Sequence, residues 1–320
     1  MTALLKSIAR ESGLSLKFVE KIAYQAPHSY RRYTIAKRDG GRREIFHPRA
    51  ELKLLQSWIS RNIIERLPVH DAALAYRRGL SIRDNALKHC KNNFLLKLDF
   101  ENFFPSIRAR DIAHLLLKNE DAWPKSIDRE DVGLICRITC RQDVEFEADR
   151  PVAHVYALTI GAPSSPGIAN AVMYEFDDMV GKLCLLHGVT YTRYADDLYF
   201  STNTPEVLAS VELEVRKLVT ELQQPKLKLN EAKTIRTSRK RRRISTGLVL
   251  TSDHKISIGR DKKRALRSLV FNFTTGKLLP EEISRLRGQL AYVKSVEPTF
   301  IASLEKKFGF AEIERLRQGG

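Results

Sequence analysis

The chain has 320 residues, of which 43% are apolar, enough to bury a continuous core in one or two domains. Lysine and arginine outnumber aspartate and glutamate by 55 to 38, and the net charge of +17 predicts a polyanionic partner such as nucleic acid. No apolar run approaches the roughly 18 to 20 residues needed to span a bilayer, and no signal-peptide pattern opens the chain, so we expect a cytoplasmic protein without a membrane partner.

The first part of the chain shows a hairpin and a helix. Two strand-like segments, 33–37 and 43–47, flank Arg38-Asp39-Gly40-Gly41, and Asp-Gly-Gly between β-prone residues is a strong hairpin signal. Apolar residues then recur at helical spacing from Leu52 to Leu67, which predicts an amphipathic helix.

The later part alternates strands and helices. Residues 94–99 form an apolar-rich run that fits a buried strand ending on an acid, and Ser165-Pro166 opens a helix expected to run to Leu186. Residues 189–201 are rich in Thr, Tyr, Val and Phe on both sides of Ala195-Asp196-Asp197, which predicts a hairpin whose turn carries two carboxylates. The remaining expectations are a helix over 205–224, a strand over 227–230, and basic helices beyond 255, including 281–293 and 300–317.

The four cysteines do not suggest a disulfide framework, because they are few and scattered. Cys136 and Cys140 lie four apart on a predicted helix, 131–140, which could place two thiolates on one face. No second Cys or His pair follows at zinc spacing, so we interpret all four as reduced thiols, with zinc as the minor alternative.

The carboxylates Asp99, Asp196 and Asp197 carry the strongest chemical signal. Two-metal phosphoryl transfer needs hard oxygen ligands held close together, and carboxylates supply them. An acid at the end of a buried strand and an acid pair on a hairpin meet only if those strands lie side by side. Three crowded carboxylates repel one another, so the arrangement predicts bound cations.

A lone Asp-Asp pair is more often a solvated turn. Here apolar and aromatic residues flank the pair and would bury it, and buried carboxylates are retained when paired or bound to metal. Tyr194-Ala195-Asp196-Asp197 resembles the catalytic box of reverse transcriptases, and Asp99-Phe100-Glu101-Asn102-Phe103-Phe104 resembles their first catalytic motif.

The resemblance implies an α+β right-hand polymerase fold that copies RNA into DNA. The catalytic ligands of two Mg²⁺ ions would be Asp99, Asp196 and Asp197, with the backbone carbonyl of Phe100. Fingers and N-terminal helices are expected over residues 1–95, a palm over 96–254 with a fingers insertion at about 110–160, and a helical, RNA-binding thumb over 255–320.

The resemblance also implies a site for the incoming deoxynucleoside triphosphate. Lys37 and Arg43 would hold its triphosphate, Phe104 would be a steric gate beneath the sugar, Gly161 would allow close backbone approach, and Lys233 would protonate the pyrophosphate. Without the other motifs these residues would be read as a basic surface hairpin, a core aromatic and an exposed lysine.

Further motifs resemble those of retron enzymes. Asn85-Ala86-Leu87-Lys88-His89 matches the Asn-Ala-x-x-His motif, Thr246-Gly247 falls in a Val-Thr-Gly-like segment, and the chain stops near the expected end of the thumb. This sequence departs from the family at Ile160, where a glutamine is usual, at Ser245, where a valine is usual, and over 141–156, which is longer than the usual connection. The residues expected to bind RNA are Asn85, His89, Thr246, Gly247, Arg260, Lys262, Lys263, Arg264 and Arg267.

A retron enzyme implies dedicated partners. These are a structured noncoding RNA used as template, multicopy single-stranded DNA as product, primed from a guanosine 2′-hydroxyl, and a separate effector or toxin protein within antiphage defence or a toxin–antitoxin pair. The alternatives are an intron-like or diversity-generating reverse transcriptase, which would share the three aspartates, and a non-catalytic RNA-binding scaffold.

Overall fold

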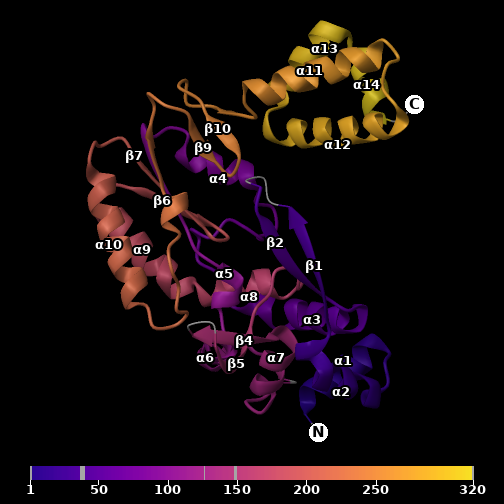
Figure 1. Cartoon of the computed structure of the whole chain (residues 1–320), viewed down its shortest axis with the longest axis vertical. Helices are drawn as coiled ribbons and strands as arrows, with labels where there is room; N and C mark the ends of the chain where they lie inside the picture. Colours follow the sequence, from indigo (N-terminus) through magenta and orange to yellow (C-terminus); the bar gives the residue numbers. More distant parts are fainter. Residues whose placement is uncertain (1, 37–39, 126, 148–149, 319–320) are drawn as a thin grey trace.

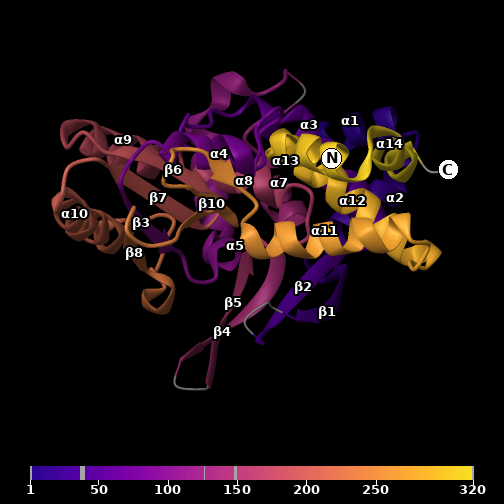
Figure 2. The same ribbon diagram turned by 90° about the horizontal axis from the view of Figure 1, so that it is seen from above.

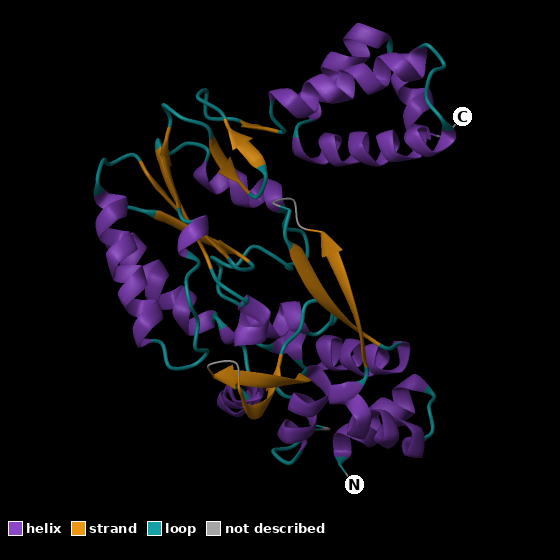
Figure 3. Ribbon diagram, viewed as in Figure 1, coloured by secondary structure: helices purple, strands orange, loops and turns teal. Residues whose placement is uncertain are grey.

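The computed structural model describes residues 2–36, 40–125, 127–147 and 150–318. A central sheet lies between a mixed N-terminal region and a C-terminal bundle of helices (Figure 1). Helices make up most of both ends of the molecule, and the strands of the central sheet lie between them (Figure 3). The four cysteines are free and buried.

The N-terminal region contains the hairpin that the sequence predicts. Its strands are longer than expected and pair from Tyr30 with Pro48 to Ala36 with Arg42. The helix expected over 52–67 ends at Asn62 and is followed by a 3-10 turn. The elements are α1 (Ala3–Ser12), α2 (Leu16–Gln25), η1 (Ala26–His28), β1 (Tyr30–Ala36), β2 (Arg42–Pro48), α3 (Ala50–Asn62) and η2 (Ile64–Arg66).

The central sheet is antiparallel, with the strand order β6-β7-β3-β8. Its strands are β3 (Phe94–Asp99), β6 (Thr190–Tyr194), β7 (Asp197–Thr202) and β8 (Ile235–Ser238). The prediction of a strand over 227–230 was wrong, because in that segment Leu229 forms only an isolated bridge with Phe100. The fourth strand of the sheet is β8, which pairs with β3. The predictions at 94–99 and 189–201 are confirmed.

The two faces of this sheet pack on different partners because side chains alternate along a strand. Leu96, Leu98 and Phe200 join the core beneath α9 (Tyr174–Leu186) and α10 (Val207–Glu221). Leu95 and Tyr199 face the other way, into a second buried cluster. That cluster contains residues of α4 (Ile82–His89) and of a small sheet made of β9 (Arg243–Ser245), β10 (Leu248–Leu250) and β11 (Ile256–Ser257).

An insertion follows β3. The segment noted at 141–156 forms a hairpin that extends from the same side of the molecule as β1 and β2 (Figure 2). The single helix expected from Ser165 to Leu186 is two helices separated at Met173, whose ψ of 1° leaves the helical range. The elements are α5 (Phe103–Ser106), α6 (Ala109–Lys118), η3 (Glu120–Ala122), α7 (Asp131–Thr139), β4 (Arg141–Glu147), β5 (Arg150–Ala157) and α8 (Ser165–Val172).

The C-terminal bundle buries its own apolar side chains in the second cluster. One helix was expected over 300–317, but Gly309, with φ +92°, separates two. The helices are α11 (Arg260–Thr274), α12 (Pro280–Val296), α13 (Pro298–Phe308) and α14 (Phe310–Gln318). Within the described ranges no helix is both long and apolar enough to cross a membrane.

Candidate active site

Asp99 and Asp197 lie directly opposite each other at the end of the central sheet. They are the last cross-strand pair of β3 and β7, so their side chains point to the same face, the one that carries Tyr199. Asp196 occupies the two-residue turn before β7, in which Ala195 adopts φ +59°. The Phe100 N–H donates to the Asp196 carbonyl at 3.0 Å and ties this turn to the end of β3.

The local electrostatics disfavour three negative charges. Burial raises the pKa of Asp99, which is 3% exposed, and the neighbouring Asp197 carboxylate raises it further, while Lys233 works against the rise. Burial also raises the pKa of Asp196, and the charge of Asp99 adds to that effect. Asp99 and Asp196 are therefore harder to ionise at this position unless cations are present.

Two lysines supply positive charge at this position. Lys97 Nζ lies 2.7 Å from Asp197 Oδ1, and Lys233 Nζ lies 2.9 Å from Asp99 Oδ1. Burial alone would lower the pKa of Lys233, but the Asp99 carboxylate overcomes burial and the pKa is raised. In the part of the chain that the structure describes, no group of three or more acidic, His or Cys side chains forms a ready metal site. The oxygen donors nevertheless suit a hard divalent cation, which would compete with the two lysines for them.

A buried ion pair between Arg193 and Asp177 holds the Ala195-Asp196 turn in place. Arg193 and Asp177 have no exposed side-chain surface, and their guanidinium and carboxylate groups approach to 2.7 Å. The Arg193 guanidinium also donates to the Ala195 carbonyl at 3.2 Å and to the Asn170 side chain. The sequence analysis missed this pair, although an arginine inside an aromatic-rich strand was a signal.

The backbone of Phe100 is better placed for a ligand than its side chain. The ring is 2% exposed and stacks on Phe103 at 5.8 Å. The bonds across the bridge to Leu229 use the Glu101 N–H and the Asp99 carbonyl, not the Phe100 carbonyl.

The residues expected around the nucleotide come from separate parts of the fold. Phe104 is half-buried on α5, with its ring 6.3 Å from that of Tyr76. Gly161 adopts φ +107°, and an added Cβ would lie 3.3 Å from Ile45, so a glycine is required where this loop meets β2. Ile160 accepts a backbone hydrogen bond from Phe46 at 3.3 Å.

Two further residues, Lys37 and Arg43, were expected to contact the nucleotide. Lys37 falls outside the described residues. Arg43 pairs with Ile35 through the backbone, and its side chain is likewise outside the description.

The expectation that Asn85 and His89 contact RNA requires correction, because both side chains are fully buried. Asn85 donates to Ser245 at 2.8 Å, and His89 lies 2.7 Å from both Ser201 and Thr192. Burial lowers the pKa of His89 to about 3, so the ring is neutral at pH 7. These residues join α4 to the central sheet and to β9.

Thr246 and Gly247 form the tight turn between β9 and β10. Both have positive φ, 48° and 82°, as a two-residue hairpin turn requires. The Thr246 hydroxyl donates to the Ile82 carbonyl at 3.0 Å, and its N–H donates to the Tyr199 hydroxyl at 3.0 Å. Sequence reasoning also missed Tyr199 and Lys97, although a lysine inside a buried strand was a signal for the latter.

Most of the basic residues expected to bind RNA are exposed on α11. Arg260, Lys262, Arg264 and Arg267 are exposed. Lys263 differs, because it is half-buried and lies 2.5 Å from Glu297. The ion pair holds its charge within the bundle, and its expected RNA contact stays a prediction.

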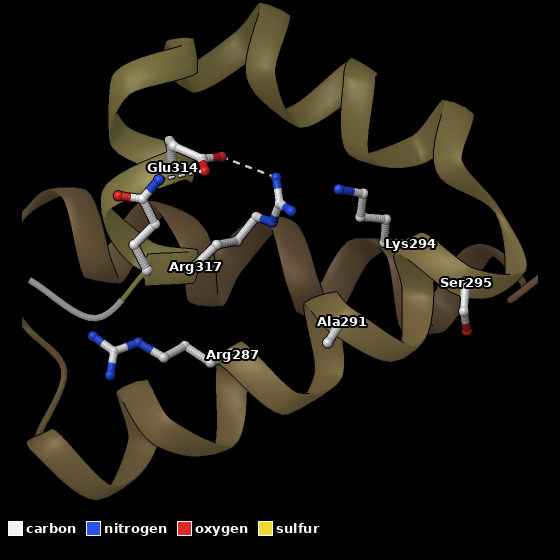
Figure 4. Close-up of a pocket in the computed structure, with 7 residues that line it drawn as sticks. Arg287, Ala291, Lys294, Ser295, Glu314 and Arg317 are labelled. Atoms are coloured by element: carbon white, nitrogen blue, oxygen red, sulfur yellow. Dashed lines mark hydrogen bonds and ion pairs between the residues drawn. The ribbon is translucent and has the colours of Figure 1, made fainter.

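A pocket of about 500 Å³ lies within the bundle rather than at the aspartates (Figure 4). Basic groups from α12 and α14 border it, and Arg317 is bonded to Glu314. The residues that line it are Arg287, Ala291, Lys294, Ser295, Glu314, Arg317 and Gln318.

Comparison with known proteins agrees with this geometry. The model of the family described as "Reverse transcriptase (RNA-dependent DNA polymerase)" matches residues 35–250. The Retron Ec83 reverse transcriptase of Escherichia coli is 35% identical over 289 residues, 90% of each chain. The Retron Ec73 reverse transcriptase of the same species is 34% identical, over 91% of this chain and 90% of that one. The solved structure of apo telomerase from Candida tropicalis is 13% identical and has a TM-score of 0.47, with 90% of this chain and 60% of that chain covered. No residue role is inferred from this similarity.

The fold and the family match define an RNA-directed DNA polymerase of the right-hand type. Within that class, the chain belongs to the retron reverse transcriptases.

Proposed function

We propose that this enzyme adds nucleotides to a DNA end at Asp99, Asp196 and Asp197, with two Mg²⁺ ions as cofactors. The observation that carries the proposal is the cross-strand pairing of Asp99 with Asp197 beside the turn that presents Asp196. Mg²⁺ bound there would neutralise the phosphate and activate the attacking hydroxyl. The three side chains and the Phe100 carbonyl would hold the ions, and Lys97 and Lys233 would give up their carboxylate contacts when the ions bind.

The nucleotide would lie between this sheet and the β1–β2 hairpin. In this proposal Lys37 and Arg43 hold the triphosphate, Phe104 lies beneath the sugar, and Lys233 protonates the leaving pyrophosphate. Gly161 supports the arrangement indirectly, since its missing side chain allows the loop to approach β2.

The division into working parts is part of the same proposal. Residues 1–95 would serve as N-terminal helices and fingers, 96–254 as the palm with its inserted 110–160 segment, and 255–320 as the thumb. The C-terminal helices share the second buried cluster with α4 and with the small sheet of β9 to β11, which supports a thumb that is attached through that sheet.

The template would be a cognate structured noncoding RNA. Exposed cations on α11 support a phosphate-binding face, and Thr246 and Gly247, in the turn between β9 and β10, would add to the RNA contacts. Arg287 and Lys294 would extend this face around the pocket of Figure 4. The product would be multicopy single-stranded DNA primed from a guanosine 2′-hydroxyl, and a separate effector or toxin protein would complete a defence or toxin–antitoxin system.

Primer extension tests the catalytic part of the proposal. The wild-type enzyme should extend an annealed primer on an RNA template with Mg²⁺ and deoxynucleoside triphosphates. Asp197→Asn should abolish extension and leave RNA affinity within about twofold, because it removes one charge from a small site on a basic protein. Asp178→Asn, a partly exposed acid outside the site, is the control. Substantial extension by Asp197→Asn would reject the assignment.

A further inference from the structure

Tyr199 lies two residues beyond Asp197 on β7, on the same face of the sheet, and its side chain is buried. Its hydroxyl donates to Asp197 Oδ2 at 3.0 Å. The ring packs against His89 with 5.9 Å between centroids. Tyr199 is therefore a rigid buried group that touches a candidate metal ligand directly.

The direction of this hydrogen bond follows from a second hydrogen bond to the same hydroxyl. The Thr246 N–H donates to the Tyr199 hydroxyl at 3.0 Å, so the oxygen acts there as the acceptor. A phenol has one hydrogen to donate, and Asp197 Oδ2 is the acceptor within reach. The chain of contacts thus runs from the β9–β10 turn to the carboxylate.

The turn that supplies this N–H is itself held in an unusual backbone conformation. Thr246 is β-branched and adopts φ +48°, a region that such residues rarely occupy. The bond from its hydroxyl to the Ile82 carbonyl holds it against α4. Strained residues persist where surrounding contacts fix them, and here the fixed group is the donor to Tyr199.

The two oxygens of Asp197 have different partners. Oδ2 accepts from Tyr199, while Oδ1 faces the Lys97 ammonium at 2.7 Å. We propose that Tyr199 is a positioning residue: it fixes the Asp197 carboxylate so that Oδ1 is presented to a metal ion, and the Thr246 turn fixes Tyr199. This inference rests on the proposed role of Asp197 as a metal ligand.

Direct measurement of metal binding tests the inference. Mn²⁺ is titrated into the full chain bound to an annealed primer–template, and free Mn²⁺ is read from its electron paramagnetic resonance signal. Tyr199→Phe keeps the ring and removes the hydroxyl, and it should weaken Mn²⁺ binding about three- to tenfold, the effect of one lost hydrogen bond. Tyr30→Phe is the matched control, because that hydroxyl bonds Gln56 far from the aspartates, and its Mn²⁺ affinity should stay within about twofold.

A second variant tests the Thr246 turn, whose N–H donates to the Tyr199 hydroxyl. Thr246→Val keeps the branched shape and removes the bond to Ile82, so it should weaken Mn²⁺ binding in the same direction by a smaller factor. Unchanged Mn²⁺ affinity in Tyr199→Phe and Thr246→Val, whatever happens to their thermal unfolding, would overturn the inference.

Asp197→Asn separates this failure from failure of the proposed function. It should weaken Mn²⁺ binding more than Tyr199→Phe does. If Asp197→Asn weakens Mn²⁺ binding and Tyr199→Phe does not, only the positioning role of Tyr199 is rejected. If Asp197→Asn also leaves Mn²⁺ binding unchanged, the metal-ligand assignment itself is wrong.

Discussion

Lys233 donates to both carboxylate oxygens of Asp99, with its ammonium nitrogen 2.9 Å from Oδ1 and 3.1 Å from Oδ2. The lysine reaches Asp99 from η4 (Glu231–Lys233), which follows a loop tied to the end of β3 by a bond from the Asn230 N–H to the Asp99 carbonyl at 2.8 Å. The ammonium therefore competes with any metal for the same oxygens, and in the proposed reaction the same group protonates the leaving pyrophosphate.

Replacing Lys233 with methionine separates these two effects. Nucleotide addition should slow by about a hundredfold, the scale of a lost general acid. Mn²⁺ affinity should rise, because the competing cation is gone. Lys228→Met, which removes an exposed lysine of the same loop that pairs with Glu101, should change neither quantity. Single-turnover rates and Mn²⁺ titration measure the two effects, and weaker Mn²⁺ binding in Lys233→Met would contradict the competition argument.

Phe104 is expected to exclude ribonucleotides. Phe104→Ala removes bulk and no charge, so polymerisation should persist while the ratio of ribonucleotide to deoxyribonucleotide incorporation rises at least about tenfold. Phe103→Leu is the control, since Phe103 is buried beside it and should leave the ratio unchanged. An unchanged ratio in Phe104→Ala would mean that the ring is only part of the core.

The buried Arg193–Asp177 pair should dominate the stability of the central sheet. Arg193→Met leaves the Asp177 carboxylate buried without its cation, with the Tyr191 hydroxyl as a remaining donor, so the free energy of unfolding should fall by about 3–5 kcal/mol. The double variant Arg193→Met/Asp177→Leu should recover part of that loss. Asp178→Ala breaks an exposed pair with Lys182 on the same helix and should cost under about 1 kcal/mol. Denaturant unfolding measures all three, and a loss in Arg193→Met no larger than in Asp178→Ala would contradict the prediction.

His89 should make the protein less stable in mild acid. Its pKa is lowered to about 3 in the folded state from an ordinary value of 6.5, so the unfolded chain binds the proton first as the pH falls. The contribution of His89 to the free energy of unfolding is fully present above about pH 6.5. It is lost as the pH falls towards 3, by up to about 1.4 kcal/mol per pH unit. His89→Gln should show a shallower loss of unfolding free energy between pH 6.5 and 4.5.

Local patterns predicted the parts of the fold that depend on neighbours in sequence. Residues 94–99 and the hairpin around Asp196 were recognisable because alternation and a tight turn are encoded within a dozen residues. Residues 235–238 were missed as a strand because they carry no apolar run, and only pairing with β3 makes them one. The break at Gly309 was missed although a glycine at a helix end is a known stop signal.

The candidate site shows the same division. The identities of the three aspartates followed from motifs, whereas the acidity of Asp99 and Asp196 depends on burial and on Lys233, which no spacing in the sequence reveals. Asn85 and His89 illustrate the opposite case. Their polar side chains within a motif suggested contact with RNA. In the structure they are buried and form hydrogen bonds with Ser245 and Ser201, which lie far away in the sequence.

Selection of one RNA requires contacts outside the polymerase site, because that site would read backbone geometry common to every template. RNA duplexes are recognised through shape, loops and 2′-hydroxyls by basic side chains on a rigid support. The bundle of α11 to α14 offers such a support, with Arg260, Lys262 and Arg264 exposed on its first helix. The competing interpretation is a generic phosphate-binding face for the template–primer duplex.

Exchanging residues 261–320 for the corresponding segment of another retron enzyme distinguishes the two interpretations. The chimera should reverse transcribe the noncoding RNA of the donor enzyme and lose preference for its own. Extension of an annealed artificial primer–template should persist, because the aspartates and β1–β2 are unchanged. A competition assay with both RNAs in one reaction measures the preference. If the chimera still prefers its original RNA, recognition lies elsewhere, and the exposed basic run 239–242, beside the buried Arg243, is the next segment to exchange.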